Sequence, residues 1–239
     1  MIQINVQHQL THAPTPTPRT LAVASLFGLT LEPYSAELIP PTTLTLAPGR
    51  VVFITGTSGG GKSTFLRRIA EALEDRSDAS VLLLDADEPL PDTALVDGFD
   101  HAPSDALDWS QPGPHDLAGP LRWLGLAGLS DARLMLRQPH QLSEGQRHRY
   151  RLARLIEAVD RCADAQEPDH AELVVVLADE FLTPLDRVTA AAVAGTTARW
   201  ARRAGVCLVA ATAHDDLLEP LGPDVLVDAT PQGIQVSCQ

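Results

Sequence analysis

Val51-Val52-Phe53-Ile54-Thr55-Gly56-Thr57-Ser58-Gly59-Gly60-Gly61-Lys62-Ser63-Thr64 is the stretch that decides the fold of this 239-residue chain. Its apolar start predicts a buried strand, and residues 56–63 match the phosphate-binding pattern G-x-x-x-x-G-K-[ST]. Residues 64–73 follow with the apolar spacing of a helix. Strand, loop and helix in this order are the context in which the pattern binds phosphate, so we predict an α/β fold with a P-loop NTPase core.

The residue types of this loop suit a phosphate guest. Its four glycines let consecutive backbone N–H groups point inward, and the helix that begins near Lys62 adds the positive end of its dipole. Lys62 is the only lysine in the chain. We expect it to reach the β- and γ-phosphates of ATP, and we expect the Ser63 hydroxyl to hold Mg²⁺. The residues predicted to bind ATP in this segment are Gly56, Thr57, Ser58, Gly59, Gly60, Gly61, Lys62, Ser63 and Thr64.

Composition narrows the class of protein. A formal net charge of −13 disfavours nonspecific binding to DNA or to anionic membranes. Three cysteines without metal-ligand spacing are typical of a reduced, cytoplasmic protein. Residues 1–8 alternate like a strand and lack the pattern of a secretion signal, and every apolar run is far shorter than the roughly 20 residues of a membrane span. We expect one domain, residues 1–239, with a cytoplasmic location and no direct membrane insertion.

The remaining patterns predict alternating elements. The Pro/Thr-rich residues 11–20 predict a linker that is not helical, and residues 88–120, rich in Pro, Asp and Gly, predict an irregular surface region. Strands and helices are expected in the following order: strand 81–85, helix 121–136, helix 142–159, strand 173–178, helix 187–203, strand 206–211 and a terminal hairpin of 224–227 with 233–236.

Four segments of the second half carry a family resemblance. They are Leu142-Ser143-Glu144-Gly145-Gln146, the run from Leu173 to Asp179-Glu180, Thr183-Pro184-Leu185-Asp186, and Thr212-Ala213-His214-Asp215. After the phosphate loop, and in this order, they resemble the signature, Walker B, D-loop and switch-histidine motifs of ATP-binding cassette (ABC) ATPases. The resemblance implies an ATP-hydrolysing enzyme whose P-loop core carries N-terminal antiparallel strands and a reduced helical subdomain at about residues 112–160.

The resemblance also assigns catalytic roles. Asp179 would hold Mg²⁺ through water, and Glu180 would orient or deprotonate the attacking water. His214 would contact the γ-phosphate and sense hydrolysis. A core histidine at a strand end is the alternative for His214.

A second set of residues is implied to act across an interface. Ser143, Gly145 and Gln146 belong to the signature, which in the family contacts the ATP of the opposite subunit. Asp186 would link the two sites. The implied assembly is a head-to-tail homodimer that encloses ATP.

Three assignments stay open. Gln111 is the best match to the family's glutamine between P-loop and signature, which contacts the metal, but it also fits a plain surface loop. The adenine-stacking aromatic residue could be Tyr34 or Phe27; Tyr34 has the better spacing, and core packing is the alternative for both. Asp85 and Asp87 end another apolar strand, but their position before the signature favours a solvated strand end over Walker B.

The kind of ABC ATPase is predicted less directly. Only residues 112–142 separate Gln111 from Ser143, which leaves a small version of the subdomain where transporter ATPases hold their membrane partner. The sequence therefore favours an ATPase that is not a transporter and acts on an unknown protein or nucleic-acid partner. An ATP-binding subunit of an ABC transporter is the alternative, and a nucleotide-binding module without turnover is a third.

Further features of the sequence bear on the kind of ABC ATPase and its partner. Several segments within roughly residues 50–228 are similar to the ATPase part of predicted ABC ATPases fused to a GNAT-type acetyltransferase, which implies ATP chemistry and not acyl transfer. Glu144 replaces the first glycine of the signature, and Pro184 is expected to stiffen the D-loop. One helix carries the only hint of nucleic-acid binding, a row of arginines that also fits a solvated helix face: Arg147, Arg149, Arg151 and Arg154.

Overall fold

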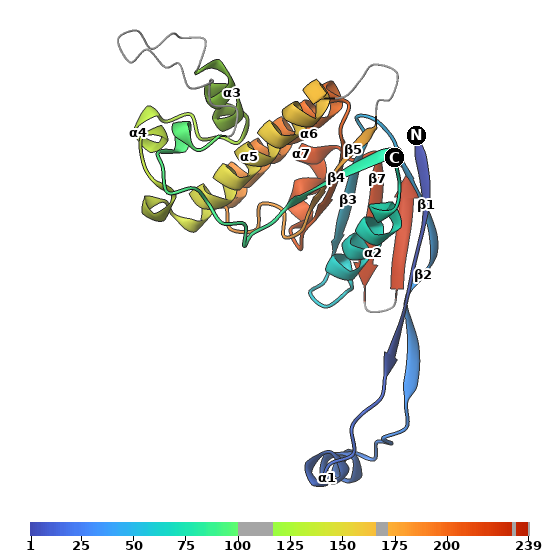
Figure 1. Cartoon of the computed structure of the whole chain (residues 1–239). Helices are drawn as coiled ribbons and strands as arrows, with labels where there is room; N and C mark the ends of the chain where they lie inside the picture. The colour runs from blue at the N-terminus through green and yellow to red at the C-terminus, as the bar shows by residue number, and fades with distance from the viewer. Residues whose placement is uncertain (100–116, 166–171, 231–232, 239) are drawn as a thin grey trace.

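A six-stranded sheet forms the centre of the protein, with helices on both faces and a two-stranded ribbon at one side (Figure 1). The computed structural model describes residues 1–99, 117–165, 172–230 and 233–238. The elements in chain order are β1 Ile2–His12, α1 Pro18–Phe27, β2 Tyr34–Leu46, β3 Val51–Gly56, α2 Lys62–Glu74, β4 Ala79–Leu84, η1 Leu95–Asp97, α3 Ala118–Leu126, α4 Ala132–Met135, η2 Pro139–Gln141, α5 Glu144–Ala165, β5 Leu173–Ala178, α6 Arg187–Ala204, β6 Cys207–Ala211, η4 Asp215–Leu217, α7 Leu218–Leu221, β7 Val225–Thr230 and β8 Gly233–Cys238.

The sheet has the strand order β4-β5-β6-β3-β7-β8, and the candidate site lies at the carboxyl ends of its parallel strands. Strands β4, β5, β6, β3 and β7 are parallel to one another. Strand β8 pairs antiparallel with β7 and forms the hairpin that the sequence predicts. In parallel strands the carboxyl ends meet at the same edge, where ligands of open α/β sheets bind. Gly56, Ala178 and Ala211, the last residues of β3, β5 and β6, therefore lie at one end of the sheet.

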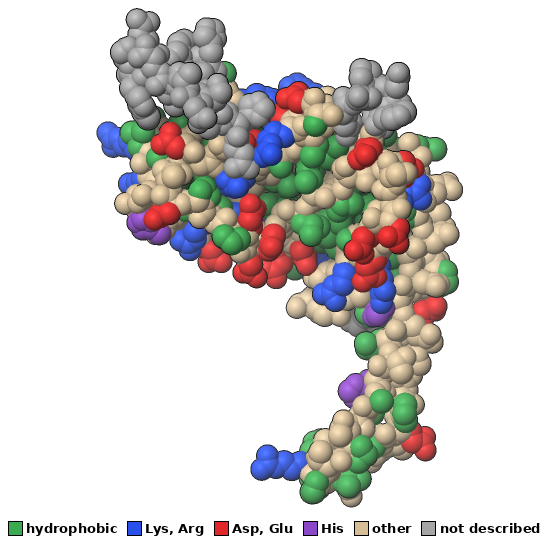
Figure 2. Space-filling model, in the orientation of Figure 1, with side chains coloured by type: hydrophobic (Ala, Val, Ile, Leu, Met, Phe, Trp, Pro, Cys, Tyr) green, Lys and Arg blue, Asp and Glu red, His purple; other side chains and the backbone are tan. Residues whose placement is uncertain are grey.

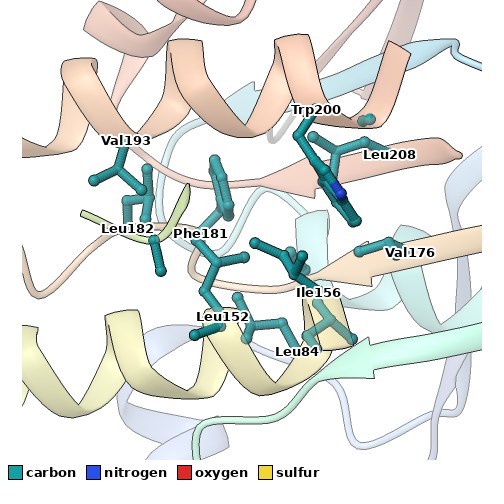
Figure 3. Packing of buried hydrophobic residues seen from close by; sticks show 14 of the residues in the cluster. Leu84, Leu152, Ile156, Val176, Phe181, Leu182, Val193, Trp200 and Leu208 are labelled. Atoms are coloured by element: carbon teal, nitrogen blue, oxygen red, sulfur yellow. The ribbon is translucent and has the colours of Figure 1, made fainter. Parts of the chain in front are cut away.

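The middle of the sheet is covered on both faces, so β5 and β6 are buried and apolar along their whole length. Val51 and Phe53 face the cluster formed with α5 and α6, whereas Val52 and Ile54 face α2 and the ribbon. Figure 3 shows part of the first cluster: side chains of α5 and α6 pack against β4, β5 and β6, and Phe181 and Leu182 lie between the two helices. Its labelled members are Leu84, Leu152, Ile156, Val176, Phe181, Leu182, Val193, Trp200 and Leu208.

The amino-terminal ribbon differs from the expected short strand and linker. β1 runs to His12, and the supposed linker at residues 11–20 ends in the first turn of α1. The prediction failed because proline is compatible with helix at its first position, where no N–H is needed. Pro18 takes that position, and the Thr17 hydroxyl caps the helix by accepting the Thr20 N–H.

Within the described residues, the later predicted strands and helices occur in the predicted order, and one of the predicted helices is divided. The single helix expected at residues 121–136 is divided into α3 and α4, because Gly128 adopts a left-handed conformation with φ of 77° between them. The α/β core and the N-terminal antiparallel strands are as predicted. No helix in the described ranges is both long and apolar enough to pass through a membrane.

Candidate functional site

The phosphate loop packs so tightly on β7 that two of its positions exclude any side chain. A Cβ atom added to Gly56 would lie 2.0 Å from the carbonyl oxygen of Ala229, and one added to Gly60 would lie 2.3 Å from it. Gly56, Gly59 and Gly61 also have φ of 128°, 78° and 95°, which favour glycine. The loop is therefore fixed by its backbone.

Lys62 is the first residue of α2, and its ammonium group points back toward the loop. Its Nζ donates to the carbonyl oxygens of Gly56 and Thr57, at 2.8 and 2.9 Å. A cavity of about 330 Å³ opens at this helix end, between the loop and the carboxyl ends of β5 and β6. Its walls are formed by Leu38, Ser58, Gly59, Gly61, Lys62, Ser63, Thr64, Asp179, Glu180, Thr183, Thr212 and Ala213.

The acidic pair reaches this cavity on a strained turn. Asp179 follows β5, and its Oδ1 accepts the N–H of Glu180 at 2.9 Å. Glu180 and Leu182 are the non-glycine residues with positive φ among the described residues, at 47° and 59°. Between them Phe181 is fully buried, and its N–H donates to the carbonyl oxygen of Ala211 at 2.8 Å. Such conformations cost about 1–3 kcal/mol each and persist only where the surroundings impose them.

His148 helps to impose that turn, and sequence reasoning missed it. Its Nε2 accepts the buried N–H of Leu182 at 3.3 Å, so α5 is tied directly to the segment that carries Glu180. His148 is 6% exposed. Burial, together with the positive charge of Arg151, lowers the pKa of His148 from 6.5 to about 4. The ring is therefore neutral near pH 7, as an acceptor must be. Nothing in the sequence but its place on the signature helix pointed to this role.

The signature segment forms its own cap at the start of α5, away from the cavity. The Ser143 N–H donates to Oε1 of Gln146 at 3.0 Å, and the Gln146 N–H donates to Oγ of Ser143 at 3.3 Å. A Cβ atom at Gly145 would lie 3.1 Å from the carbonyl oxygen of Pro184, so the signature packs against the D-loop of its own chain. None of the signature residues lines the cavity at the phosphate loop.

The remaining predicted residues are not all brought to the cavity. His214 directly follows the wall residue Ala213, and its N–H donates to Oγ1 of Thr212 at 3.3 Å. Asp186 caps α6 by accepting the Thr189 N–H at 3.0 Å, a bond that lowers the pKa of this carboxyl group. Gln111 lies outside the described residues.

The two aromatic candidates for adenine stacking lie elsewhere. Tyr34 packs its ring against His12, with ring centroids 5.5 Å apart, at the outer end of the ribbon. Phe27 is 73% exposed at the end of α1. The ribbon residue at the cavity is instead Leu38, four residues further along β2. Spacing in the sequence could not show this, because an inserted helix occupies the turn of the ribbon.

The arginine row on α5 is not a solvated face. All four side chains are half-buried, and each donates to a backbone carbonyl oxygen of a neighbouring segment. The acceptors belong to Leu142, Gly128, Glu88 and Gly98. These guanidinium groups attach α5 to its surroundings, so the row gives little support to nucleic-acid binding.

The polar groups around the cavity fit a nucleotide with a bound metal ion. The loop amides, Lys62 and the amino end of α2 present positive charge, which suits phosphate. The Ser63 hydroxyl and the Asp179 carboxylate are hard oxygen ligands of the kind Mg²⁺ prefers, and both line the same cavity. A glycine loop on a helix end with an acidic pair at a nearby strand end defines a P-loop nucleotide hydrolase.

Comparison with known proteins gives the family. The family model described as ABC transporter matches residues 40–160, and the chain belongs to this family. Hemin import ATP-binding protein HmuV of Bordetella parapertussis and that of Bordetella bronchiseptica are each 30% identical over 174 residues, or 66% of this chain. The chain spans 64% of the length of these curated relatives. The predicted family is thereby confirmed.

Solved structures support the same fold. The dimeric structure of MJ0796, described as a bacterial ABC transporter cassette, has a TM-score of 0.61 at 17% identity, covering 99% of this chain and 98% of that one. CbiO1 from Clostridium perfringens, described as part of the transporter complex cbiONQ, has a TM-score of 0.55 at 16% identity, covering 83% and 80%. The resemblance to acetyltransferase-fused ATPases stays a prediction.

Proposed function

We propose that this chain is the ATP-binding subunit of an ABC transporter, and that it hydrolyses ATP in sites shared by two chains. One observation carries the proposal: the phosphate loop, Asp179 and Glu180 enclose a single cavity, while Ser143 and Gly145 lie outside it. A site that lacks its signature half within one chain is completed by a second chain under two-fold symmetry.

The residues of the cavity have distinct tasks in this proposal. The loop amides and Lys62 hold the β- and γ-phosphates, and Glu180 accepts a proton from the attacking water while orienting it. Ser63 and Asp179 would hold Mg²⁺, which offsets charge on the phosphates. The partner chain's Ser143 and Gly145 then contribute the hydroxyl, amide and helix-end dipole that complete the γ-phosphate contacts.

The transporter role is favoured by the relatives. HmuV is named as a hemin import ATP-binding protein, and CbiO1 is described as part of a transporter complex. The non-transport alternative rests on the short segment between Gln111 and Ser143. That argument is weakened by a groove of about 420 Å³ between residues 87–92 and α5, bordered by His140 and Arg151. A groove between the core and the signature subdomain is where a membrane partner would be held.

Light scattering tests the shared sites. Glu180→Gln should keep Mg-ATP bound but stop turnover, because the general base is lost while the phosphate contacts remain. This variant should change from monomer to dimer when Mg-ATP is added. Adding Ser143→Arg should prevent the change by placing bulk and charge at the interface. A Glu180→Gln protein that binds ATP but stays monomeric well above its ATP dissociation constant would contradict the proposal.

Affinity purification from detergent-solubilised membranes tests the transporter role. The Glu180→Gln chain should recover a multi-span membrane protein in stoichiometric amount. A charge reversal in the groove, Arg151→Glu, should reduce that recovery without changing ATP binding. Recovery of soluble partners alone would favour the non-transport alternative.

A further inference from the structure

The amino-terminal ribbon continues beyond the body of the protein as an arm. Near its start Ile4 and Val6 of β1 and Leu44 of β2 are buried against α2 and the sheet. The pairing is irregular between Val6 and Gln9, and outward of this point the two strands continue to pair with each other alone, as far as His12 and Tyr34. We call residues 8–38 the arm. Figure 1 shows it extending away from the sheet, with α1 at its far end.

The arm leaves the body beside the phosphate loop. Leu38 lines the phosphate cavity and would lie 3.5 Å from a Cβ atom on Gly61, and the Arg68 guanidinium of α2 contacts Nδ1 of His8 at 2.6 Å. Residues 34–37 extend outward from Leu38. At about 3.3 Å per residue they carry the arm about 13 Å past the loop, and residues 28–33 connect them to the end of α1 at Phe27. α1 therefore lies beyond the phosphate loop, on the side of the molecule where the parallel strands have their carboxyl ends.

The far end of the arm is apolar and almost uncovered. Ala24 is the one buried residue of α1, and five large apolar side chains nearby are at least half exposed: Leu21, Val23, Leu26, Phe27 and Leu29. Figure 2 shows this apolar surface at the end of the arm, with few charges around it. An isolated helix of ten residues is marginally stable in water, and an exposed apolar cluster of this kind marks a contact surface.

We propose that the arm of each chain contacts a second copy of this chain. In this dimer α1 packs against the surface of that copy around its signature and D-loop. This inference rests on the head-to-tail dimer proposed above. The arm starts at the cavity that the second copy would close, so its surface is continuous with that interface. Its reach of about 13 Å past the phosphate loop would place α1 alongside the second copy.

The surface that receives α1 has matching chemistry. Leu136, just before the signature, is 74% exposed, and Val188, just after the D-loop, is 81% exposed. Both lie on the half of the chain that supplies Ser143. The chain as a whole carries −13, whereas α1 has Arg19 as its one charged residue. An uncharged, apolar contact can form between two acidic chains without adding like-charge repulsion.

The first test measures dimerisation. In the Glu180→Gln background with Mg-ATP, the double variant Leu26→Glu/Phe27→Glu should raise the dimer dissociation constant at least about tenfold, while ATP affinity changes by less than about twofold. The matched control is Leu117→Glu/Leu121→Glu, which adds the same charge to exposed residues at α3, away from the arm. Equal dimerisation of the arm variant and the control would overturn the proposal and leave the shared ATP sites intact.

The second test locates α1. A benzophenone attached to Leu26→Cys, in the Glu180→Gln background with the exposed Cys238 changed to Ser, should crosslink to a second copy within residues 132–165 or 187–204. The crosslink should need Mg-ATP and disappear with Ser143→Arg. Crosslinks confined to lipid, to a membrane protein or to the same chain would overturn the proposal. Failure of Glu180→Gln itself to dimerise would overturn both this inference and the shared sites.

Discussion

The phosphate loop and the amino end of α5 carry the two halves of the proposed ATP site, and they are held in different ways. The loop is fixed by backbone packing, since a Cβ atom at Gly60 would lie 2.3 Å from the Ala229 carbonyl oxygen. The signature end is packed less tightly, at 3.1 Å for Gly145, and the side chain of His148 attaches α5 to Leu182, two residues after Glu180. The comparison separates a phosphate half that is fixed by backbone contacts from a signature half that is attached to the acidic turn by a side-chain hydrogen bond.

The same substitution in both halves should separate them most strongly. Gly60→Ala must displace backbone and should lower the free energy of unfolding by at least about 3 kcal/mol, whereas Gly145→Ala should cost under about 1 kcal/mol. Urea unfolding of both variants measures this. Similar losses at the two positions would contradict the difference in packing.

Lys62→Ala tests whether the rigid half binds phosphate through its one lysine. Removing a charged donor from the loop should weaken ATP binding by about 100-fold, which corresponds to about 3 kcal/mol. Calorimetry gives the affinity, and circular dichroism should show an unchanged fold. Retained affinity in a folded variant would refute the assignment of Lys62.

His148→Leu tests the link between the halves. It leaves the Leu182 N–H buried without an acceptor, so the free energy of unfolding should fall by about 2 kcal/mol. Turnover should fall as well, because the strained turn at Glu180 loses support. His148→Gln keeps an acceptor at this place and should restore most of both properties. If Leu and Gln behave alike, the hydrogen bond has no positioning role.

The lowered pKa of His148 gives the smallest predicted effect. Below pH 6.5 the unfolded chain binds a proton that the folded chain does not bind until about pH 4, so stability should fall as pH falls through this range. The expected loss is about 1 kcal/mol between pH 6 and pH 5. Unfolding at both pH values measures it. Relative to wild type, the His148→Gln variant should lose this component of the pH dependence.

Local patterns in the sequence predicted the sheet core and the phosphate half. Residues 51–64 contain the strand, the glycines and the helix start within one short segment, so their geometry depends little on distant contacts. The order of the later motifs predicted the Walker B pair and the signature. Spacing pointed to Tyr34 for adenine stacking, but it could not show that α1 projects outward between β1 and β2 or that Leu38 is the ribbon residue at the cavity.

The sequence by itself therefore determined the class of fold, the phosphate loop and the identity of the acidic pair. Only the tertiary structure decided what depends on contacts between distant segments. It placed the neutral His148 against Leu182, packed Gly60 against Ala229 and brought Leu38 of β2 to the cavity. The physical reason is that a local motif carries its own backbone geometry, whereas a hydrogen bond or a close approach across the fold requires both partners to be positioned by the whole sheet.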